Sequence, residues 1–149
     1  MSTVSKLFPE PSAIRLEELL DGVVWGINAK RQNILNQYGV GEMDVRIITF
    51  LAENEEKKMK EVGEHFNIKL STLTSTIDKL EKGKLVKRKN SREDRRVIFI
   101  KPTAKGQKLL VDLNEVTRSL AESLVHDRPA GEYESILKAL ETMKHVINR

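Results

Sequence analysis

Apolar residues recur at helical spacing along most of this chain. One stripe of apolar residues lies 0, 3, 4, 7, 8 and 11 positions from its first member: Leu16, Leu19, Leu20, Val23, Val24 and Ile27. Side chains at this spacing share one face of a helix, so we predict a long helix that begins after Pro11 and ends before Gly39. The same reasoning predicts shorter helices at about 44–52 and 59–66.

A further helix is predicted from Leu70 to Lys82, where Gly83 follows another periodic stripe. We expect every member of this stripe to face inward: Leu70, Leu73, Ile77 and Leu80. After the glycine the pattern changes to two short strand-like runs, at 85–89 and 97–100, on either side of a charged turn. These runs predict a hairpin.

Two more helical stripes follow the hairpin and are separated by Pro129. Together the elements predict a mostly α fold with a small antiparallel β-wing, namely a winged helix-turn-helix flanked by long N- and C-terminal dimerisation helices. We expect a single domain over 1–149. Its winged-helix DNA-binding lobe would span about 42–102, and its dimerisation helices about 11–38 and 103–149.

The flanking helices are expected to dimerise because the lobe between them is small. A unit of about 60 residues cannot cover the apolar stripes of three further helices, whereas two copies of the chain can bury them against each other. The alternative is that these stripes pack within one chain, and both kinds of packing can hold in part.

Positive charge is concentrated in the middle of the chain. The whole sequence has 26 basic and 22 acidic residues, for a net charge of +4. Residues 84–105 alone contain 9 basic and 2 acidic side chains, a larger surplus than that of the whole chain. Such a stretch suits a polyanion, and we expect double-stranded DNA as the partner. A solvated loop of lysines and arginines is the alternative.

The outer face of the helix at 70–82 is short, polar and rich in hydroxyl groups. Its candidate DNA-contacting residues are Ser71, Thr72, Thr74, Ser75 and Lys79. Small side chains let a helix enter a major groove about 12 Å wide, and hydroxyl groups bond to phosphates or base edges. The alternative is an ordinary surface helix, although such a helix more usually presents Glu and Lys.

The predicted hairpin supplies a second set of candidate contacts. Three cations line the approach to its tip, where they suit phosphates: Lys87, Arg88 and Lys89. Three more lie at the tip, where the negative potential of a minor groove favours arginine: Arg92, Arg95 and Arg96. DNA would repel Asp94, so we expect this residue to brace the turn or a neighbouring arginine.

The segment from Leu70 to Gly106 resembles the MarR family of bacterial and archaeal transcription regulators. The motifs that carry the resemblance are Ser71-Thr72-Leu73-Thr74, Leu80-Glu81-Lys82, Leu85-Val86-Lys87-Arg88, Glu93-Asp94-Arg95-Arg96 and Thr103-Ala104-Lys105-Gly106. The Asp-Arg-Arg wing followed at a fixed distance by Thr-x-x-Gly is quite specific. The resemblance implies a homodimeric winged-helix DNA-binding protein, usually a repressor of nearby genes.

The same resemblance implies regulation by a ligand, because family members often bind small aromatic or phenolic compounds between the dimerisation helices and the DNA-binding lobe. Here Trp25, Tyr38 and Phe50 would supply apolar walls for a small aromatic inducer. The alternative places these aromatics in the core or in an interface. An inducer would need to prefer a dimer whose helix spacing does not match the DNA grooves.

Other classes of function are excluded by what the sequence lacks. It has no cysteine, which excludes disulfides, thiol catalysis and thiolate metal sites. Its three histidines lie far apart, and it has no phosphate-binding loop or nucleophile motif, so we expect no enzyme, no cofactor and no metal. We also expect no signal peptide and no membrane partner, and therefore a cytoplasmic, nucleoid-associated protein.

These expectations combine into one function, a sequence-specific DNA-binding transcription regulator that acts as a homodimer on a pseudo-palindromic operator. The alternative is a winged-helix module for protein contacts or for non-specific DNA packaging. Binding that survives competitor DNA at physiological salt would distinguish the first function from the second.

Overall fold

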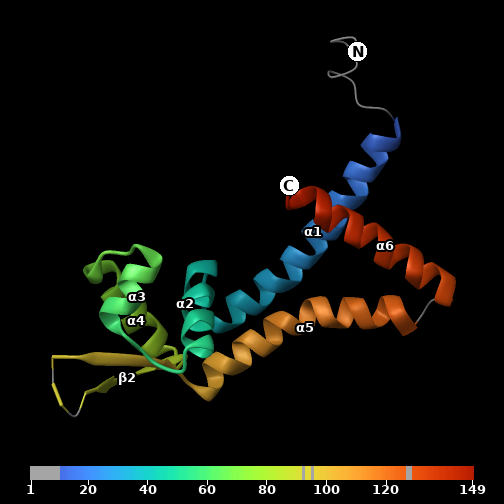
Figure 1. Ribbon diagram of the computed structural model, residues 1–149. Coiled ribbons are helices and arrows are strands. Elements are labelled where there is room, and N and C mark those ends of the chain that lie inside the picture. The colour runs from blue at the N-terminus through green and yellow to red at the C-terminus, as the bar shows by residue number, and fades with distance from the viewer. Residues whose placement is uncertain (1–10, 92, 95, 127–128) are drawn as a thin grey trace, which may run out of the picture. The chain divides into compact units, whose positions relative to one another are not determined.

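The computed structural model describes residues 11–91, 93–94, 96–126 and 129–149 (Figure 1). In these ranges the elements are α1 (Pro11–Tyr38), α2 (Glu42–Glu53), β1 (Lys57–Lys58), α3 (Met59–Phe66), α4 (Leu70–Lys82), β2 (Val86–Asn90), β3 (Ile98–Pro102), α5 (Ala104–His126) and α6 (Ala130–Ile147). The chain divides into two compact units, the first ending at Leu113 and the second running from Asn114 to Arg149. No helix in the described ranges is long and apolar enough to cross a membrane.

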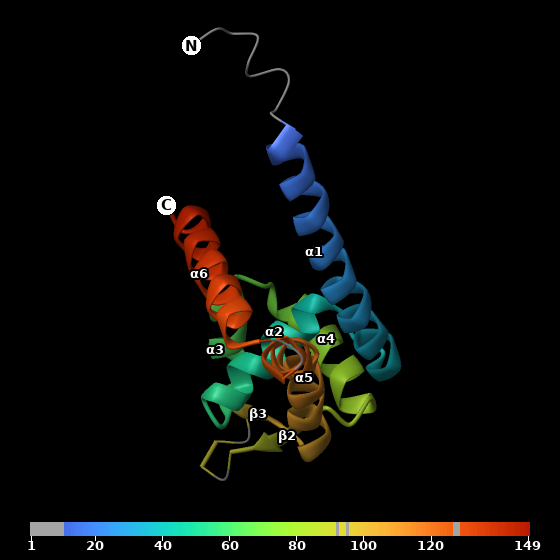
Figure 2. The same ribbon diagram turned by 90° about the vertical axis from the view of Figure 1, so that its right-hand side faces the viewer.

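The strands of the described residues form one antiparallel sheet in the order β1-β3-β2. β2 and β3 are the predicted hairpin strands, and they extend beyond α3 and α4 (Figures 1 and 2). The mostly α fold with a small antiparallel β-wing is confirmed. The sequence does not predict β1, in which Lys57 pairs with Ile100 and Lys58 with Phe99. Lysine has little preference for strands, so this pairing depends on the presence of β3.

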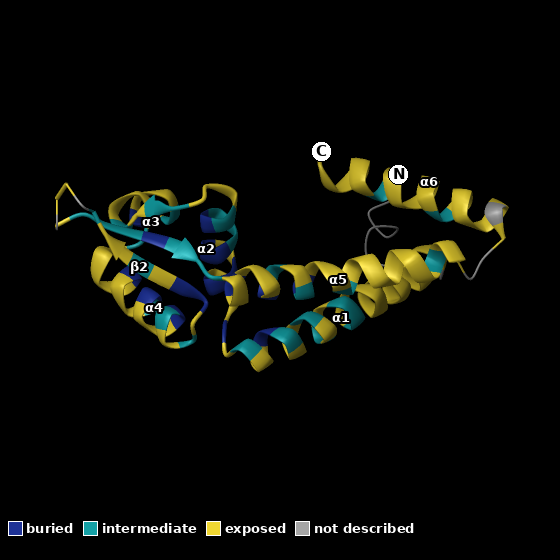
Figure 3. Ribbon diagram, turned by 90° about the horizontal axis from the view of Figure 1, so that it is seen from below, coloured by how far each residue is buried: buried dark blue, intermediate teal, exposed yellow. Residues whose placement is uncertain are grey.

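The core of the first unit forms where α2 and α4 pack against the sheet (Figure 3). Its fully buried side chains include Ile47, Ile48 and Leu51 from α2, Leu73, Ile77 and Leu80 from α4, and Ile100 from β3. Leu35 of α1 and Leu109 of α5 belong to the same core. Burial of one such side chain contributes about 1.5–3 kcal/mol. This cluster therefore holds α4 with its opposite face toward solvent.

α3 and α4 form a helix-turn-helix around residues 67–69. Asn67 adopts the left-handed conformation (φ 51°), and the Ile68 N–H donates to the Gly63 carbonyl at 2.9 Å. A Cβ on Gly63 would lie 3.3 Å from the Ile68 carbonyl oxygen. The absence of a side chain at Gly63 thus lets the chain turn back closely enough to start α4.

The expectation that Leu70 faces inward is wrong. Leu70 is 60% exposed, whereas Leu73, Ile77 and Leu80 are completely buried. Leu70 is the first residue of α4, and helical side chains lean toward the N-terminus of their helix. Its side chain therefore points past the end of the core.

The first turn of α5 is attached to the segment between α4 and β2. The Thr103 N–H donates to the Leu85 carbonyl at 3.0 Å, and the Thr103 hydroxyl donates to the Lys84 carbonyl at 2.6 Å. The same hydroxyl accepts a bond from the Gly106 N–H at 3.1 Å, which caps α5. A Cβ on Gly106 would lie only 2.2 Å from the Leu85 carbonyl oxygen. These contacts explain the Thr-x-x-Gly motif.

Gly106→Ala should lower the free energy of unfolding by about 2 kcal/mol or more, because its methyl group meets a backbone oxygen. Chemical denaturation measures the change. Gly22→Ala in α1 is the control, since no atom lies within 4 Å of a Cβ built there. It should raise stability by up to about 1 kcal/mol through helix propensity. Equal effects of the two variants would contradict the close approach at Gly106.

Candidate nucleic-acid interface

α4 presents its hydroxyl-bearing face at the surface. Four of the predicted contact residues are exposed there: Ser71, Thr72, Thr74 and Ser75. Burial of Leu73 and Ile77 turns this face outward. The structure thus brings these four side chains together on one accessible helix surface of the first unit.

Lys79, the fifth predicted contact on α4, has a partner inside the protein. Its ammonium forms an ion pair with the Asp44 carboxylate of α2, which is only 8% exposed. Asp44 also accepts a hydrogen bond from the Gly41 N–H at 2.8 Å, at the start of α2. Lys79 therefore compensates a buried carboxylate and ties α4 to α2.

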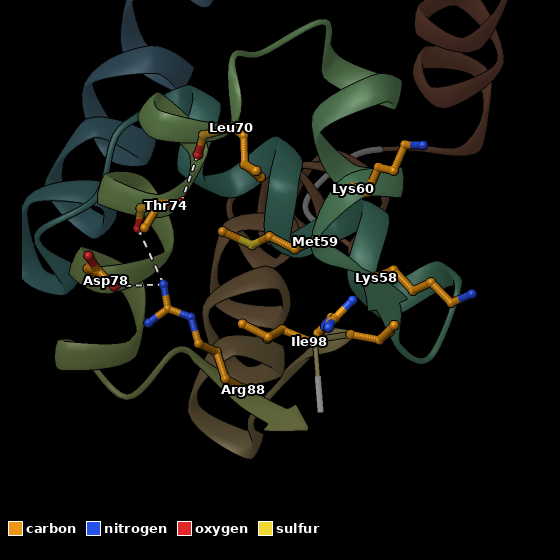
Figure 4. A pocket seen from close by; sticks show the side chains of 10 residues that line it. Lys58, Met59, Lys60, Leu70, Thr74, Asp78, Arg88 and Ile98 are labelled. Atoms are coloured by element: carbon orange, nitrogen blue, oxygen red, sulfur yellow. Dashed lines mark hydrogen bonds and ion pairs between the residues drawn. The ribbon is translucent and has the colours of Figure 1, made fainter. Parts of the chain in front are cut away.

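Arg88 of β2 connects the hairpin to α4 through what we call the Arg88 cluster, composed of Arg88, Asp78 and Glu81. Figure 4 shows the Arg88 side chain turned toward Asp78 and Thr74 of α4. Its guanidinium lies 2.6 Å from an Asp78 carboxylate oxygen and 2.7 Å from one of Glu81. The Arg88 N–H also donates to Glu81 at 3.1 Å, and the guanidinium reaches the Thr74 carbonyl at 3.4 Å. The side chain is 23% exposed and turned toward α4, so this cation joins two elements.

Sequence reasoning missed Asp44, Asp78 and Glu81 as partners of the predicted contact residues. The seven-residue separation of Glu81 and Arg88 could not reveal their contact, because a glycine ends the helix between them and the two residues lie on different elements. The one sequence signal for such a contact is the acidic pair Asp78 and Glu81 on the helix, which the basic residues 87–89 follow on the strand.

The two remaining cations of β2 differ from each other. Lys89 lies 3.8 Å from a Glu56 carboxylate oxygen. Lys87 is exposed, has no acidic partner among the described residues and sits directly opposite Lys101 in the β2–β3 ladder. Like charges at opposite positions repel each other, so this side of the sheet carries positive charge that the protein itself does not neutralise.

Asp94 stabilises the described part of the tip. Its carboxylate accepts a hydrogen bond from the Arg96 N–H at 2.9 Å, which closes the turn. The Arg96 side chain is exposed and has no acidic partner among the described residues. Arg92 and Arg95 lie outside the described residues.

A cleft of about 740 Å³ lies between α3, α4 and the hairpin (Figure 4). Its lining combines apolar side chains, among them Met59, Leu70 and Ile98, with polar groups of Thr74 and Arg88. The exposed Leu70 side chain therefore lies at the wall of a cleft that separates the helix from the hairpin.

The three aromatics predicted to line a ligand pocket are not gathered into one described cavity. Trp25 is 75% exposed on α1. The Tyr38 hydroxyl donates to Asp112 of α5 at 2.6 Å. Phe50 stacks on His65 with ring centroids 4.0 Å apart, and it lines a groove of about 540 Å³ along α2 and α3.

The contact between Tyr38 and Asp112 is part of a charged network at the start of α5. Lys108 donates a hydrogen bond to the Asp112 carboxylate at 2.7 Å, and this bond lowers the pKa of Asp112. The hydrogen bond from Tyr38 lowers the pKa of Asp112 further. The hydrogen bond to Asp112 raises the pKa of Tyr38. Asp112 is therefore ionised and Tyr38 protonated at neutral pH, which keeps α1 attached to α5.

Comparison with known proteins identifies transcription regulators. A family model described as transcriptional regulator SarA/Rot matches residues 30–113. The HTH-type transcriptional regulator YfiV of Bacillus subtilis (strain 168) is 33% identical over 108 residues, which cover 67% of each chain.

Two solved structures share the fold. The S. aureus MepR–DNA complex has a TM-score of 0.74 at 18% identity, over 88% of this chain and 98% of MepR. NadR, solved in complex with 4-hydroxyphenylacetate, has a TM-score of 0.53 at 29% identity, over 86% of this chain and 90% of NadR.

The matched family consists of transcription regulators and not of enzymes. Its model covers more than half of this chain, including the helix-turn-helix and the described hairpin strands. The resemblance drawn from the sequence motifs is thereby confirmed. The chain belongs to the SarA/Rot family of transcriptional regulators and is a DNA-binding winged-helix regulator of the MarR type.

Proposed function

We propose that this regulator recognises a specific, pseudo-palindromic operator as a homodimer and represses the genes beside it. The Arg88 cluster carries the proposal, because it presents the hydroxyl face of α4 and the cationic hairpin as one assembly. α4 would enter a major groove, and the hairpin would reach the neighbouring minor groove. The DNA bound to MepR supports this mode of action. Binding to an operator on chromosomal DNA would place the protein at the nucleoid, in the cytoplasm.

The cations of the proposed interface would act in two ways. Lys87 and Arg96, which have no acidic partner among the described residues, would contact DNA directly, and Arg92 and Arg95 are proposed to join them. A second group has carboxylate partners and would hold the reading elements in place: Lys79, Arg88 and Lys89. Only direct phosphate contacts release counterions and make binding depend on salt.

Homodimerisation is supported by the apolar face that α1 leaves exposed. Side chains between 39% and 55% exposed follow this face, namely Leu16, Leu19, Leu20, Val23 and Val24. α6, taken by itself, exposes Tyr133, Leu137, Leu140, Val146 and Ile147. A second copy of the chain would bury such surfaces. We therefore assign dimerisation to 11–38 and 103–149, and DNA binding to about 42–102.

Release from DNA by a small aromatic ligand is a separate part of the proposal. The groove at Phe50 supports it, because Phe66 and His65 supply further ring surfaces there and Arg46 adds a cation suited to a carboxylate. The 4-hydroxyphenylacetate bound to NadR has this chemistry. Trp25 and Tyr38 remain proposed wall residues of a site completed in the dimer. The ligand must favour a dimer that does not fit DNA.

Selection of bound fragments from a random DNA pool should recover an inverted repeat with half-sites about 34–36 Å apart, one turn of the duplex. Binding should survive excess competitor DNA at physiological salt, because base contacts add to the electrostatic attraction. An enriched sequence without symmetry would contradict the dimer. A pool without any enriched sequence would instead favour a non-specific DNA-packaging or protein-contact module.

The dimer is tested in the same assay with Val23→Glu, which places a charge on the exposed stripe of α1. Sedimentation should shift from dimer to monomer, and affinity for the selected operator should fall by about tenfold or more. Gln32→Glu adds the same charge on the opposite face of α1, and it should change neither property. A stable Val23→Glu dimer would refute this interface.

Lys87→Gln and Arg88→Gln remove one positive charge each from neighbouring positions. Arg88→Gln should lower the free energy of unfolding by about 1–2 kcal/mol, because Asp78 and Glu81 lose their partner. Lys87→Gln should leave stability within about 0.5 kcal/mol of the original. It should reduce the salt slope of operator binding by about one, unlike Arg88→Gln. The reverse pattern would show that Arg88 is the phosphate contact.

Trp25 is the only tryptophan in the sequence, so its emission reports ligand binding in the proposed site. Titration of 4-hydroxyphenylacetate should release operator DNA and change Trp25 emission with the same midpoint. Phe50→Leu, which removes a ring from the groove, should move both midpoints to higher concentration. Operator binding that is insensitive to the ligand, or release without an emission change, would contradict the proposed site.

A further inference from the structure

The middle of α4 carries hydroxyl groups whose protons are already engaged within the helix. Thr74, Ser75 and Thr76 donate to the backbone carbonyls four residues earlier, at 2.8, 3.2 and 3.1 Å. A hydroxyl group has one proton and two lone pairs. While these bonds are kept, each oxygen is available to a partner only as an acceptor.

Ser75 is the member of this group that faces away from the protein. It is exposed and lies on the opposite side of α4 from the buried Leu73. Thr76 is half-buried, and Thr74 lines the cleft beside Arg88. A duplex lying along the outer face of α4 would therefore meet the Ser75 oxygen first.

The charged neighbours of Ser75 on this face are occupied. The Asp78 carboxylate is held by Arg88, and the Lys79 ammonium is held by the buried Asp44. Both charges are thus neutralised within the protein, although each side chain keeps exposed surface. The Ser75 hydroxyl is the uncharged group between them that faces a duplex directly.

The first turn of α4 differs from its middle. Ser71 and Thr72 make no side-chain hydrogen bond among the described residues, so their hydroxyl protons remain free to donate. Phosphate oxygens accept hydrogen bonds and donate none. The two parts of the helix therefore suit different partners: donors of the first turn suit the DNA backbone, and an acceptor follows one turn later.

Within the major groove, guanine O6 and N7, adenine N7 and thymine O4 are acceptors, whereas adenine N6 and cytosine N4 carry donor amino groups. We propose that the Ser75 hydroxyl accepts a hydrogen bond from such an amino group and so selects adenine or cytosine at one position of each half-site. The bond that Ser75 donates to the Ser71 carbonyl polarises the hydroxyl and strengthens it as an acceptor. This inference rests on the proposed function, because it requires α4 to enter the major groove.

The test uses the full-length protein and the operator recovered by selection. Each adenine is replaced in turn by purine nucleoside, which lacks the N6 amino group, and each cytosine by the 2-pyrimidinone nucleoside, which lacks the N4 amino group. At one position per half-site, this replacement should weaken binding of the unmodified protein about three- to tenfold. Ser75→Ala should bind the original and the replaced operator equally at that position.

Two controls separate the acceptor role from other effects. Thr76→Ala removes an equivalent hydroxyl from a half-buried position, and it should leave the penalty for amino-group removal unchanged. Substitution of 7-deazaadenine removes the N7 acceptor and keeps the amino group, so it should show no coupling to Ser75.

Coupling of Ser75 to N7 would show that the hydroxyl donates, and it would overturn the inference. An enriched operator in which no amino group is coupled to Ser75 would overturn the inference alone. A pool without an enriched operator would overturn the proposed function as well.

Discussion

Arg88 sets the spacing between the two elements that would meet DNA. Its guanidinium binds Asp78 and Glu81 on α4, while its backbone belongs to β2. A planar guanidinium with several fixed donors constrains direction as well as distance, which a lysine ammonium does not. A duplex offers its grooves at a fixed separation. A helix and a hairpin held together in advance avoid the entropy cost of ordering them during binding.

The cationic segment therefore does more than attract a polyanion. Lys89 and Arg88 are matched by carboxylates, and the Lys105 ammonium bonds to the Gly83 carbonyl at 2.9 Å. The charges of these side chains bond to groups within the protein and hold its elements in place. In the proposed complex, attraction to phosphates would be left to cations such as Lys87, which lies opposite Lys101 in the sheet. A count of basic residues would therefore overstate the number of direct contacts in the proposed complex.

Much of the fold could be predicted because its signals are local. The bounds of α3 and α4 match their apolar stripes, Gly83 directly follows α4, and the hairpin matches its β-branched run. β1 could not be predicted, since two lysines become a strand only beside β3. The exposure of Leu70 depends on where the core ends, which no periodicity reveals.

The candidate site was predictable to a smaller extent. The exposed hydroxyl face follows from helical geometry alone. The partners of Lys79 and Arg88 depend on elements that meet only in the folded chain, so spacing could not identify them. Composition likewise supplied Trp25, Tyr38 and Phe50 but could not place them in a common cavity.

The contact between Gly106 and Leu85 has a mechanical consequence. The first turn of α5 is bonded to residues 83–85 through Thr103 and Lys105, and the missing side chain of Gly106 leaves no gap between them. That three-residue segment is the common root of α4 and β2. Rotation of the first turn of α5 would therefore move residues 83–85 with it. In the proposed complex, such a rotation would change the angle at which α4 enters the major groove.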